Sequence, residues 1–118
     1  MGELARLAAR AREEGRLGID TEFLPEGRYR PLLCLVQVAV GDEVAVWDPL
    51  QSDEDPAPMA AVLADPDIEI VLHAGRQDVA ILRRTWETEV TNLFDTQVAA
   101  GFVGLGTQES YKTLVRRV

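Results

Sequence analysis

The sequence predicts a single α/β domain on a mixed sheet, antiparallel across its first three strands and parallel across its last two. Alternating or unbroken apolar residues in several segments are typical of strands. Other segments repeat their apolar residues with the period of an amphipathic helix. The order is one helix, a group of strands, and then helices and strands in alternation, which favours a sheet flanked by helices.

The first half of the chain predicts a helix and a three-stranded antiparallel unit. Apolar residues recur at helical spacing in residues 3–14, and a glycine ends this helix. Apolar and polar residues alternate in 17–23, which predicts a first strand. Residues 32–40 form an apolar second strand. A Gly-Asp turn then leads to a third strand at 44–47, so these two strands are expected to form a hairpin.

The second half alternates short helices and strands after an acidic, proline-rich loop. The expected elements are helices at 59–64, 75–86 and 96–102 and strands at 69–73 and 93–94. Asp95 precedes the last of these helices and is expected to be its N-cap. Glycines follow, and Thr107 is positioned to cap a final helix that reaches residue 118.

Composition directs the search toward a metal rather than a basic surface. With 118 residues and a net charge of −8, the chain is too acidic to hold nucleic acid mainly by neutralising phosphates. Acidic proteins still engage phosphates when divalent cations lie between their carboxylates and the substrate. The acids of the chain are therefore the first candidates for function.

Cys34 and the length of the apolar runs indicate where in the cell the protein is expected. A single cysteine forms no internal disulfide and suits a reducing cytoplasm. No segment resembles a signal peptide, and no apolar run approaches the roughly 20 residues that cross a bilayer. We expect a cytoplasmic protein without a membrane partner.

Two acids stand close together in the first predicted strand. Asp20 and Glu22 are two residues apart, so they project from the same face about 7 Å apart along the backbone. A divalent cation would relieve their repulsion, and oxygen ligands favour magnesium or manganese. The alternative is a solvated strand face that happens to carry two acids, and Asp-X-Glu alone does not distinguish the two interpretations.

A third acid, Asp78, follows a buried strand and a glycine turn. It falls in the first turn of the predicted helix, where the helix dipole by itself favours an acid. The functional interpretation is that a parallel neighbour of the first strand brings Asp78 to the same sheet edge as the other two acids. Active sites of such sheets gather at strand ends.

Four segments resemble the ribonuclease D group of the DEDD exonucleases. Gly-Ile-Asp-Thr-Glu-Phe at 18–23 resembles the first exonuclease motif, and His-Ala-Gly-Arg-Gln-Asp at 73–78 resembles the second. Leu-Phe-Asp-Thr-Gln-Val-Ala-Ala at 93–100 is similar to the segment after the next strand, and Trp-Asp-Pro-Leu at 47–50 to a further stretch. The matches occur in the order and at the spacing of the family.

The resemblance implies a ribonuclease H-like fold and two-metal hydrolysis of RNA 3′ ends to nucleoside 5′-monophosphates. It implies that Asp20 bridges two Mg²⁺ or Mn²⁺ ions, that Glu22 holds the ion on the nucleophile side, and that Asp78 contacts the other ion. Thr21, Phe23 and His73 are candidates for substrate contacts; the alternatives are core packing for Phe23 and a hydrogen-bonded core position for His73.

One motif of the family is missing. The third motif is a tyrosine followed four residues later by an aspartate, whereas Tyr111 is followed by Val115. We therefore expect residues 1–118 to form a partial exonuclease domain that is inactive or weak by itself. Its sheet face, left bare where the missing helix would pack, is expected to favour self-association.

Two other classes remain to be distinguished. One is a non-catalytic module with the exonuclease fold, which would bind a partner without metal. The other is a phosphoacceptor receiver domain, which places its acids after the first strand and uses a lysine at a strand end. Here the acid pair lies within the strand, and the only lysine is Lys112 near the C-terminus, so this second class is disfavoured.

Overall fold

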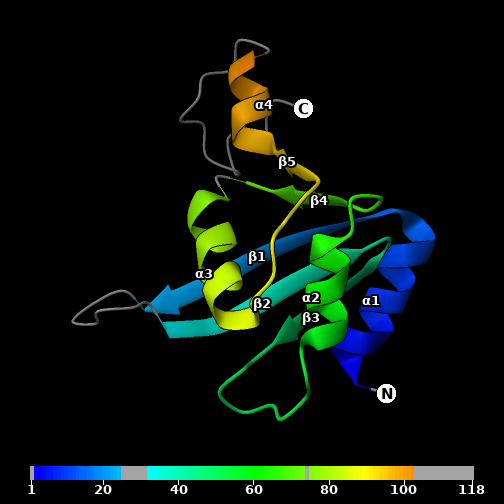
Figure 1. The fold of residues 1–118 in the computed structure, drawn as a ribbon, viewed down its shortest axis with the longest axis vertical. Helices are drawn as coiled ribbons and strands as arrows, with labels where there is room; N and C mark the ends of the chain where they lie inside the picture. The colour runs from blue at the N-terminus through cyan, green and yellow to red at the C-terminus, as the bar shows by residue number, and fades with distance from the viewer. Residues whose placement is uncertain (1, 25–31, 74, 103–118) are drawn as a thin grey trace.

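A five-stranded mixed sheet organises the chain, and the computed structural model describes it for residues 2–24, 32–73 and 75–102. The sheet order is β3-β2-β1-β4-β5, and Figure 1 shows its path. The strands are β1 (Arg16–Leu24), β2 (Leu32–Val40), β3 (Glu43–Trp47), β4 (Glu69–Leu72) and β5 (Leu93–Asp95). The helices are α1 (Glu3–Glu14), α2 (Ala57–Ala64), α3 (Arg76–Trp86) and α4 (Thr96–Phe102).

The predicted topology is confirmed. β1, β2 and β3 pair antiparallel, and β4 and β5 continue the sheet in parallel from β1. The bounds differ at a few ends. The predicted strand at 69–73 ends at Leu72, one residue before His73, and α2 begins at Ala57 because prolines are tolerated in the first turn of a helix. The helix expected from Thr107 lies outside the described residues.

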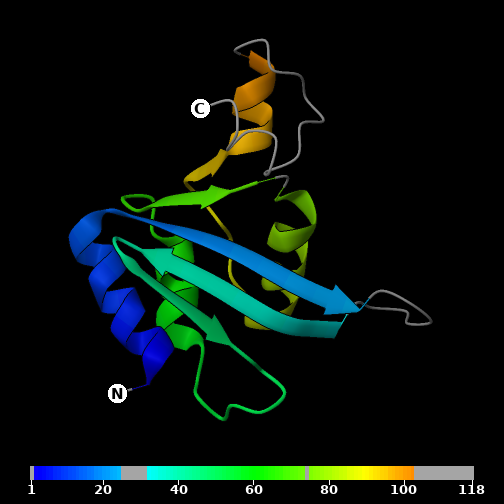
Figure 2. The same cartoon turned by 180° about the vertical axis from the view of Figure 1, so that it is seen from behind.

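The helices α1, α2 and α3 lie on one face of the sheet (Figure 1). In the view from behind, the other face carries none of the helices that the structure describes, while α4 extends beyond the β5 edge (Figure 2). The prediction of flanking helices is therefore met on one face within the described residues. Strand alternation sends Leu17, Ile19 and Thr21 into the helical layer, and Asp20 and Glu22 outward.

The core fills the space between the sheet and the three helices. Its largest fully buried side chains include Leu4 and Leu7 of α1, Met59 of α2, and Leu82 of α3. Trp47 at the end of β3 and Trp86 at the end of α3 meet edge to face, with ring centroids 5.7 Å apart. Among the described residues, no helix is long and apolar enough to cross a bilayer.

The turn between α1 and β1 sets the register of the parallel pair. Gly15 has a φ of 80°, and its N–H donates to the Ala11 carbonyl at 2.8 Å, which ends α1. The Gly15 carbonyl then accepts the N–H of Glu69 at 2.9 Å, so the start of β4 lies beside the start of β1. Because β4 is much shorter than β1, the second half of β1 extends past it.

Candidate functional site

The acids of the first motif lie where β1 loses its parallel neighbour. Pairing between β1 and β4 covers only Arg16–Gly18, so among the described residues this edge of β1 has no strand partner from Ile19 onward. β4 stops at Leu72 because the chain turns there toward α3. The first turn of α3 brings Asp78 to the free edge of β1.

Asp78 is buried and held by the residue between the two motif acids. Its side chain is only 7% exposed, and its Oδ1 accepts the backbone N–H of Thr21 at 3.0 Å. The Thr21 hydroxyl donates to the same oxygen. Two donors compensate the desolvation of this carboxylate, as a buried charge requires. The predicted approach of Asp78 to the edge of β1 is therefore seen in the structure.

The carboxyl of Asp20 has a raised pKa in this arrangement. Partial desolvation is the largest cause that raises its pKa above the ordinary value of 3.8, and the charge of Asp78 raises the pKa further. The Thr21 N–H opposes these effects, and the Glu22 charge adds a smaller increase. In the described part of the chain no arginine or lysine forms an ion pair with Asp20, Glu22 or Asp78. These three acids are called the edge cluster below, and none of them has a basic partner among the described residues.

The donor chemistry of the edge cluster suits a hard divalent cation, since every candidate ligand is a carboxylate oxygen. The fit is partial in this conformation. Asp20 and Asp78 are close enough to raise the Asp20 pKa, but the described residues contain no group of three or more His, Cys, Asp or Glu side chains that could hold a metal ion. Mutual repulsion of three like charges is a physical reason for such an open arrangement.

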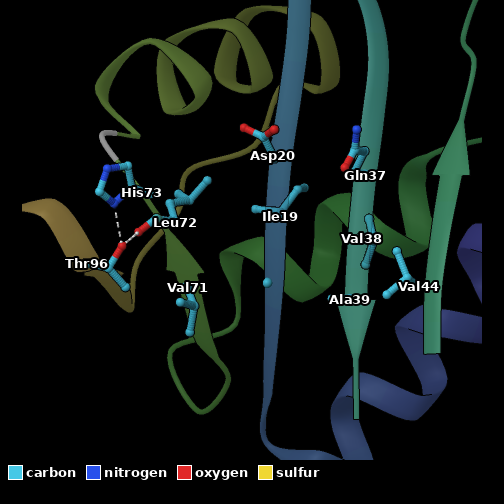
Figure 3. A pocket seen from close by; sticks show the side chains of 11 residues that line it. Ile19, Asp20, Gln37, Val38, Ala39, Val44, Val71, Leu72, His73 and Thr96 are labelled. Carbon is cyan, nitrogen blue, oxygen red and sulfur yellow. Dashed lines mark hydrogen bonds between the residues drawn. The ribbon is translucent and has the colours of Figure 1, made fainter. Parts of the chain in front are cut away.

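A cavity of about 440 Å³ lies beside Asp20 on the sheet (Figure 3). Its lining includes Gln37 and Ala39 of β2 and Val71 of β4, with His73 and Thr96 at the other side. Gln37 pairs with Asp20 across β1 and β2 and is exposed. The sequence analysis did not single out Gln37, because its role follows only from the strand register.

His73 is half-buried, and Thr96 contacts its ring. The His73 Nδ1 lies 2.8 Å from the Thr96 Oγ1, and that hydroxyl donates to the Leu72 carbonyl at 3.3 Å (Figure 3). When the hydroxyl donates to that carbonyl, the His73 Nδ1 is the donor to Thr96. This agrees with the hydrogen-bonded interpretation of His73, while the ring still lines the cavity.

The structure also places Phe23 and Asp95, two residues that the sequence singles out. Phe23 is half-buried against the core, just after a register shift that follows Glu22. Asp95 caps α4 as predicted, since its Oδ1 accepts the Gln97 N–H at 2.9 Å. Its Oδ2 also accepts the N–H of Gly75 at 2.8 Å, a link the sequence analysis missed. The only available signal was that both turns follow neighbouring parallel strands.

Comparison with known proteins identifies the family of this mixed α/β domain with its acidic edge. A family model described as a 3′-5′ exonuclease matches residues 2–118. The chain therefore belongs to this 3′-5′ exonuclease family.

Within the family, its relatives include ribonuclease D enzymes. Ribonuclease D of Gluconacetobacter diazotrophicus is 45% identical over 96% of this chain and 29% of its own length. Ribonuclease D of Zymomonas mobilis is 42% identical over 97% of this chain and 30% of its own length. The chain thus spans about 30% of the curated relatives it matches.

Solved structures agree with this placement. The crystal structure of Escherichia coli RNase D, an exoribonuclease involved in structured RNA processing, superposes with a TM-score of 0.88 at 33% identity. The match covers 97% of this chain and 30% of that one. The catalytic core of RRP6 from Trypanosoma brucei gives a TM-score of 0.78 at 27% identity, over 89% of this chain and 29% of that one.

Proposed function

We propose that this chain carries part of the active site of a metal-dependent 3′→5′ exoribonuclease of the ribonuclease D type. The observation that carries the proposal is the buried carboxylate of Asp78, held by Thr21 beside Asp20 at the free edge of β1. Acids gathered without a basic partner, at least one of them with a raised pKa, are typical of functional sites. Ribonuclease D relatives and the family match support this reading.

Each acid of the edge cluster has a distinct proposed role. Asp20 would bridge two Mg²⁺ or Mn²⁺ ions, Glu22 would hold the ion on the nucleophile side, and Asp78 would contact the other ion. When bound, such a pair generates a hydroxide nucleophile and stabilises the leaving 3′ oxygen of the scissile phosphate. Thr21 orients Asp78 from the helical side of the sheet.

The proposed substrate is the single-stranded 3′ end of an RNA, released one nucleoside 5′-monophosphate at a time. The E. coli relative is described as acting in structured RNA processing, and NrnC of Brucella melitensis, 26% identical here, was solved bound to pGG. His73 lines the cavity beside Asp20 and is proposed to contact the terminal nucleotide with Thr21 and Phe23. A cytoplasmic location is proposed from the single cysteine, Cys34.

We also propose that residues 1–118 alone hydrolyse RNA weakly or not at all. The family's Tyr–Asp pair has no counterpart here, since Tyr111 is followed four positions later by Val115. A missing carboxylate leaves a metal less firmly coordinated, and a missing tyrosine leaves the attacking water less well placed. Binding of metal and RNA should therefore outlast catalysis in this chain.

The test measures binding of a 5′-labelled single-stranded RNA by fluorescence anisotropy, with Mn²⁺ or with a chelator. We expect binding that requires Mn²⁺ and that Asp20→Ala abolishes. Equal binding with and without metal would instead favour a non-catalytic module. The same samples are then resolved by electrophoresis, and a 3′→5′ digestion ladder lost in Asp20→Ala would overturn the proposal of weak activity.

Self-association is proposed for the sheet face on which none of the described helices lies. Val44 and Val46 of β3 are 72% and 54% exposed, and apolar area of this kind favours contact between proteins. Light scattering over a range of concentrations tests this point. A mass equal to one chain at every concentration would exclude it.

A further inference from the structure

The turns that follow β4 and β5 are joined by one carboxylate. Leu72 and Asp95 are paired at the ends of these parallel strands, so the two turns leave the sheet side by side. The Asp95 Oδ2 accepts the N–H of Gly75 at 2.8 Å, and its Oδ1 accepts the N–H of Gln97 at 2.9 Å. Asp95 thus bonds to the start of α3 and to the start of α4 at once.

Gly75 is held by two backbone hydrogen bonds and lies close to Leu72. It is the N-cap of α3, and while its N–H is held by Asp95, its carbonyl accepts the N–H of Val79 at 2.8 Å. A Cβ at position 75 would lie 2.7 Å from the Cβ of Leu72, closer than atoms of this kind approach. The backbone at Gly75 therefore has little freedom to shift, and α3 begins at a defined point relative to β4 and Asp95.

The position of Asp78 depends on this starting point. Asp78 lies in the first turn of α3, and its buried Oδ1 must reach Thr21 on β1, a strand that does not contact β5 in the sheet. A small displacement of a functional group is enough to change metal affinity or rate severalfold or more. A carboxylate that anchors the start of α3 therefore influences the geometry of the edge cluster from outside it.

We propose that Asp95 is a positioning residue for Asp78, an inference that rests on the proposed function for its consequence but not for its geometry. Asp95 is not assigned as a metal ligand, because each of its oxygens already accepts a backbone N–H. It acts through Gly75 and the first turn of α3 on the contact between Asp78 and Thr21.

The experiment measures hydrogen exchange of the Thr21 amide by NMR in the 118-residue chain without metal. Asp95→Ala is expected to accelerate exchange of Thr21 about tenfold or more relative to the amide of Val38 in the interior strand β2. The ratio of the two amides separates a local effect from a general loss of stability, which would accelerate both. No change in this ratio would overturn the proposal.

Asp55→Ala is the matched control. Asp55 accepts the N–H of Ala57, two residues on, at 2.9 Å at the start of α2, just as Asp95 does for Gln97, but among the described residues it makes no hydrogen bond to α3. The Thr21-to-Val38 ratio should be unchanged in this variant. An equal change in Asp55→Ala would also overturn the proposal, because loss of any helix-start acid would then have the same effect.

Asp95→Asn covers the case in which Asp95→Ala does not fold. Asparagine has one side-chain oxygen, so it retains one of the two backbone bonds and should give a smaller change in the same direction. Failure of both variants to fold would overturn a role confined to Asp78. An Asp95→Asn variant that folds and shows a partial change in Thr21 exchange would support the proposal.

Mn²⁺ titration calorimetry separates this inference from the proposed function. Affinity is expected to fall about tenfold or more in Asp95→Ala and to stay unchanged in Asp55→Ala. If the unaltered chain binds no Mn²⁺, the metal site fails while the Thr21 measurement still decides the role of Asp95. If Mn²⁺ binds equally to the chain and to Asp95→Ala, the metal site stands and the proposed influence of Asp95 on it is wrong.

Discussion

Two acidic clusters of this fold differ in whether basic side chains pair with them. At the β2–β3 hairpin, Arg10 bonds to Asp42 at 2.8 Å and to Glu43 at 2.7 Å, and Arg6 bonds to Glu43 at 2.8 Å. The hydrogen bonds from Arg10 are the largest cause that lowers the pKa of both carboxyls. These four residues form the hairpin cluster, in which every acid has a cationic partner.

The edge cluster has no such partner in the described residues. Its Asp20 pKa is raised by desolvation and by Asp78, the reverse of what happens at Asp42. Arginines of α1 pair with the acids of the hairpin cluster, whereas the Asp78 charge repels that of Asp20 in the edge cluster. The contrast teaches that the hairpin cluster serves folding, whereas the edge cluster retains charge that a bound cation would neutralise.

The largest expected difference between the clusters concerns metal affinity. Asp20→Ala should weaken Mn²⁺ binding by at least about 100-fold, because it removes the proposed bridging ligand. Asp42→Ala removes an acid already neutralised by Arg10, so its Mn²⁺ affinity should match that of the unaltered chain. Titration calorimetry measures both, and an equal loss in the two variants would erase the distinction between the clusters.

The next effect tests how tightly the turn before α3, the helix that carries Asp78, is packed. Gly75→Ala forces a Cβ to within 2.7 Å of Leu72 and should destabilise the chain by about 1–3 kcal/mol in urea unfolding. Gly18→Ala, on β1 itself, meets the Ala39 Cβ at 3.8 Å, an ordinary contact, and should change stability by less than about 0.5 kcal/mol. Similar unfolding midpoints for the two variants would show that the turn before α3 is not tightly packed.

A smaller effect is expected at the hairpin cluster. Arg10→Ala removes partners from two acids, whereas Arg12→Ala breaks a single pair with Asp65. The urea midpoint should therefore fall further for Arg10→Ala than for Arg12→Ala. The reverse order would contradict the idea that this cluster stabilises the fold.

The pH dependence of the Arg10→Ala effect has a defined sign. The folded pKa values of Asp42 and Glu43 lie below their ordinary values of 3.8 and 4.5. Their contribution is therefore present above those ordinary values and is lost as the pH falls through the lower folded values. The difference between the unaltered chain and Arg10→Ala should persist at pH 7 and shrink on acidification below about pH 4.

The smallest expected effect is a gain in stability. Asp20→Asn removes a repelled charge and should stabilise the metal-free chain at pH 7, by less than about 1 kcal/mol because solvent screens an exposed carboxylate. The folded pKa of Asp20 lies above 3.8, so the repulsion is relieved as the pH falls through that raised value. The gain should therefore vanish in acid, and a variant less stable than the unaltered chain at pH 7 would refute the assignment of repulsion.

The fold was predictable because its elements carry strong local patterns. Apolar periodicity located α1 and β2 with the observed bounds, and Asp95 marked the start of α4. The predicted end of β4 lies one residue too late, because the apolar run before His73 does not show where the turn begins. Turn geometry of this kind depends on the elements on both sides.

The acids of the candidate site could be placed on their elements from the sequence, but their bonds could not. Asp20 and Glu22 share a strand, so their common face follows from alternation alone. The bond between Thr21 and Asp78 depends on how far β1 extends past β4, which is a property of the assembled sheet. The tie between Asp95 and Gly75 spans 20 residues and likewise appears only when the two strands pair.

The Trp47–Trp86 contact makes the chain its own optical reporter. These are the only two tryptophans, and both are at least nine-tenths buried with ring centroids 5.7 Å apart. Tryptophan fluorescence therefore comes from a single junction between β3 and α3. Because Asp78 lies at the opposite end of α3, a shift in emission on adding Mn²⁺ would reveal movement of the helix that carries it, without any label.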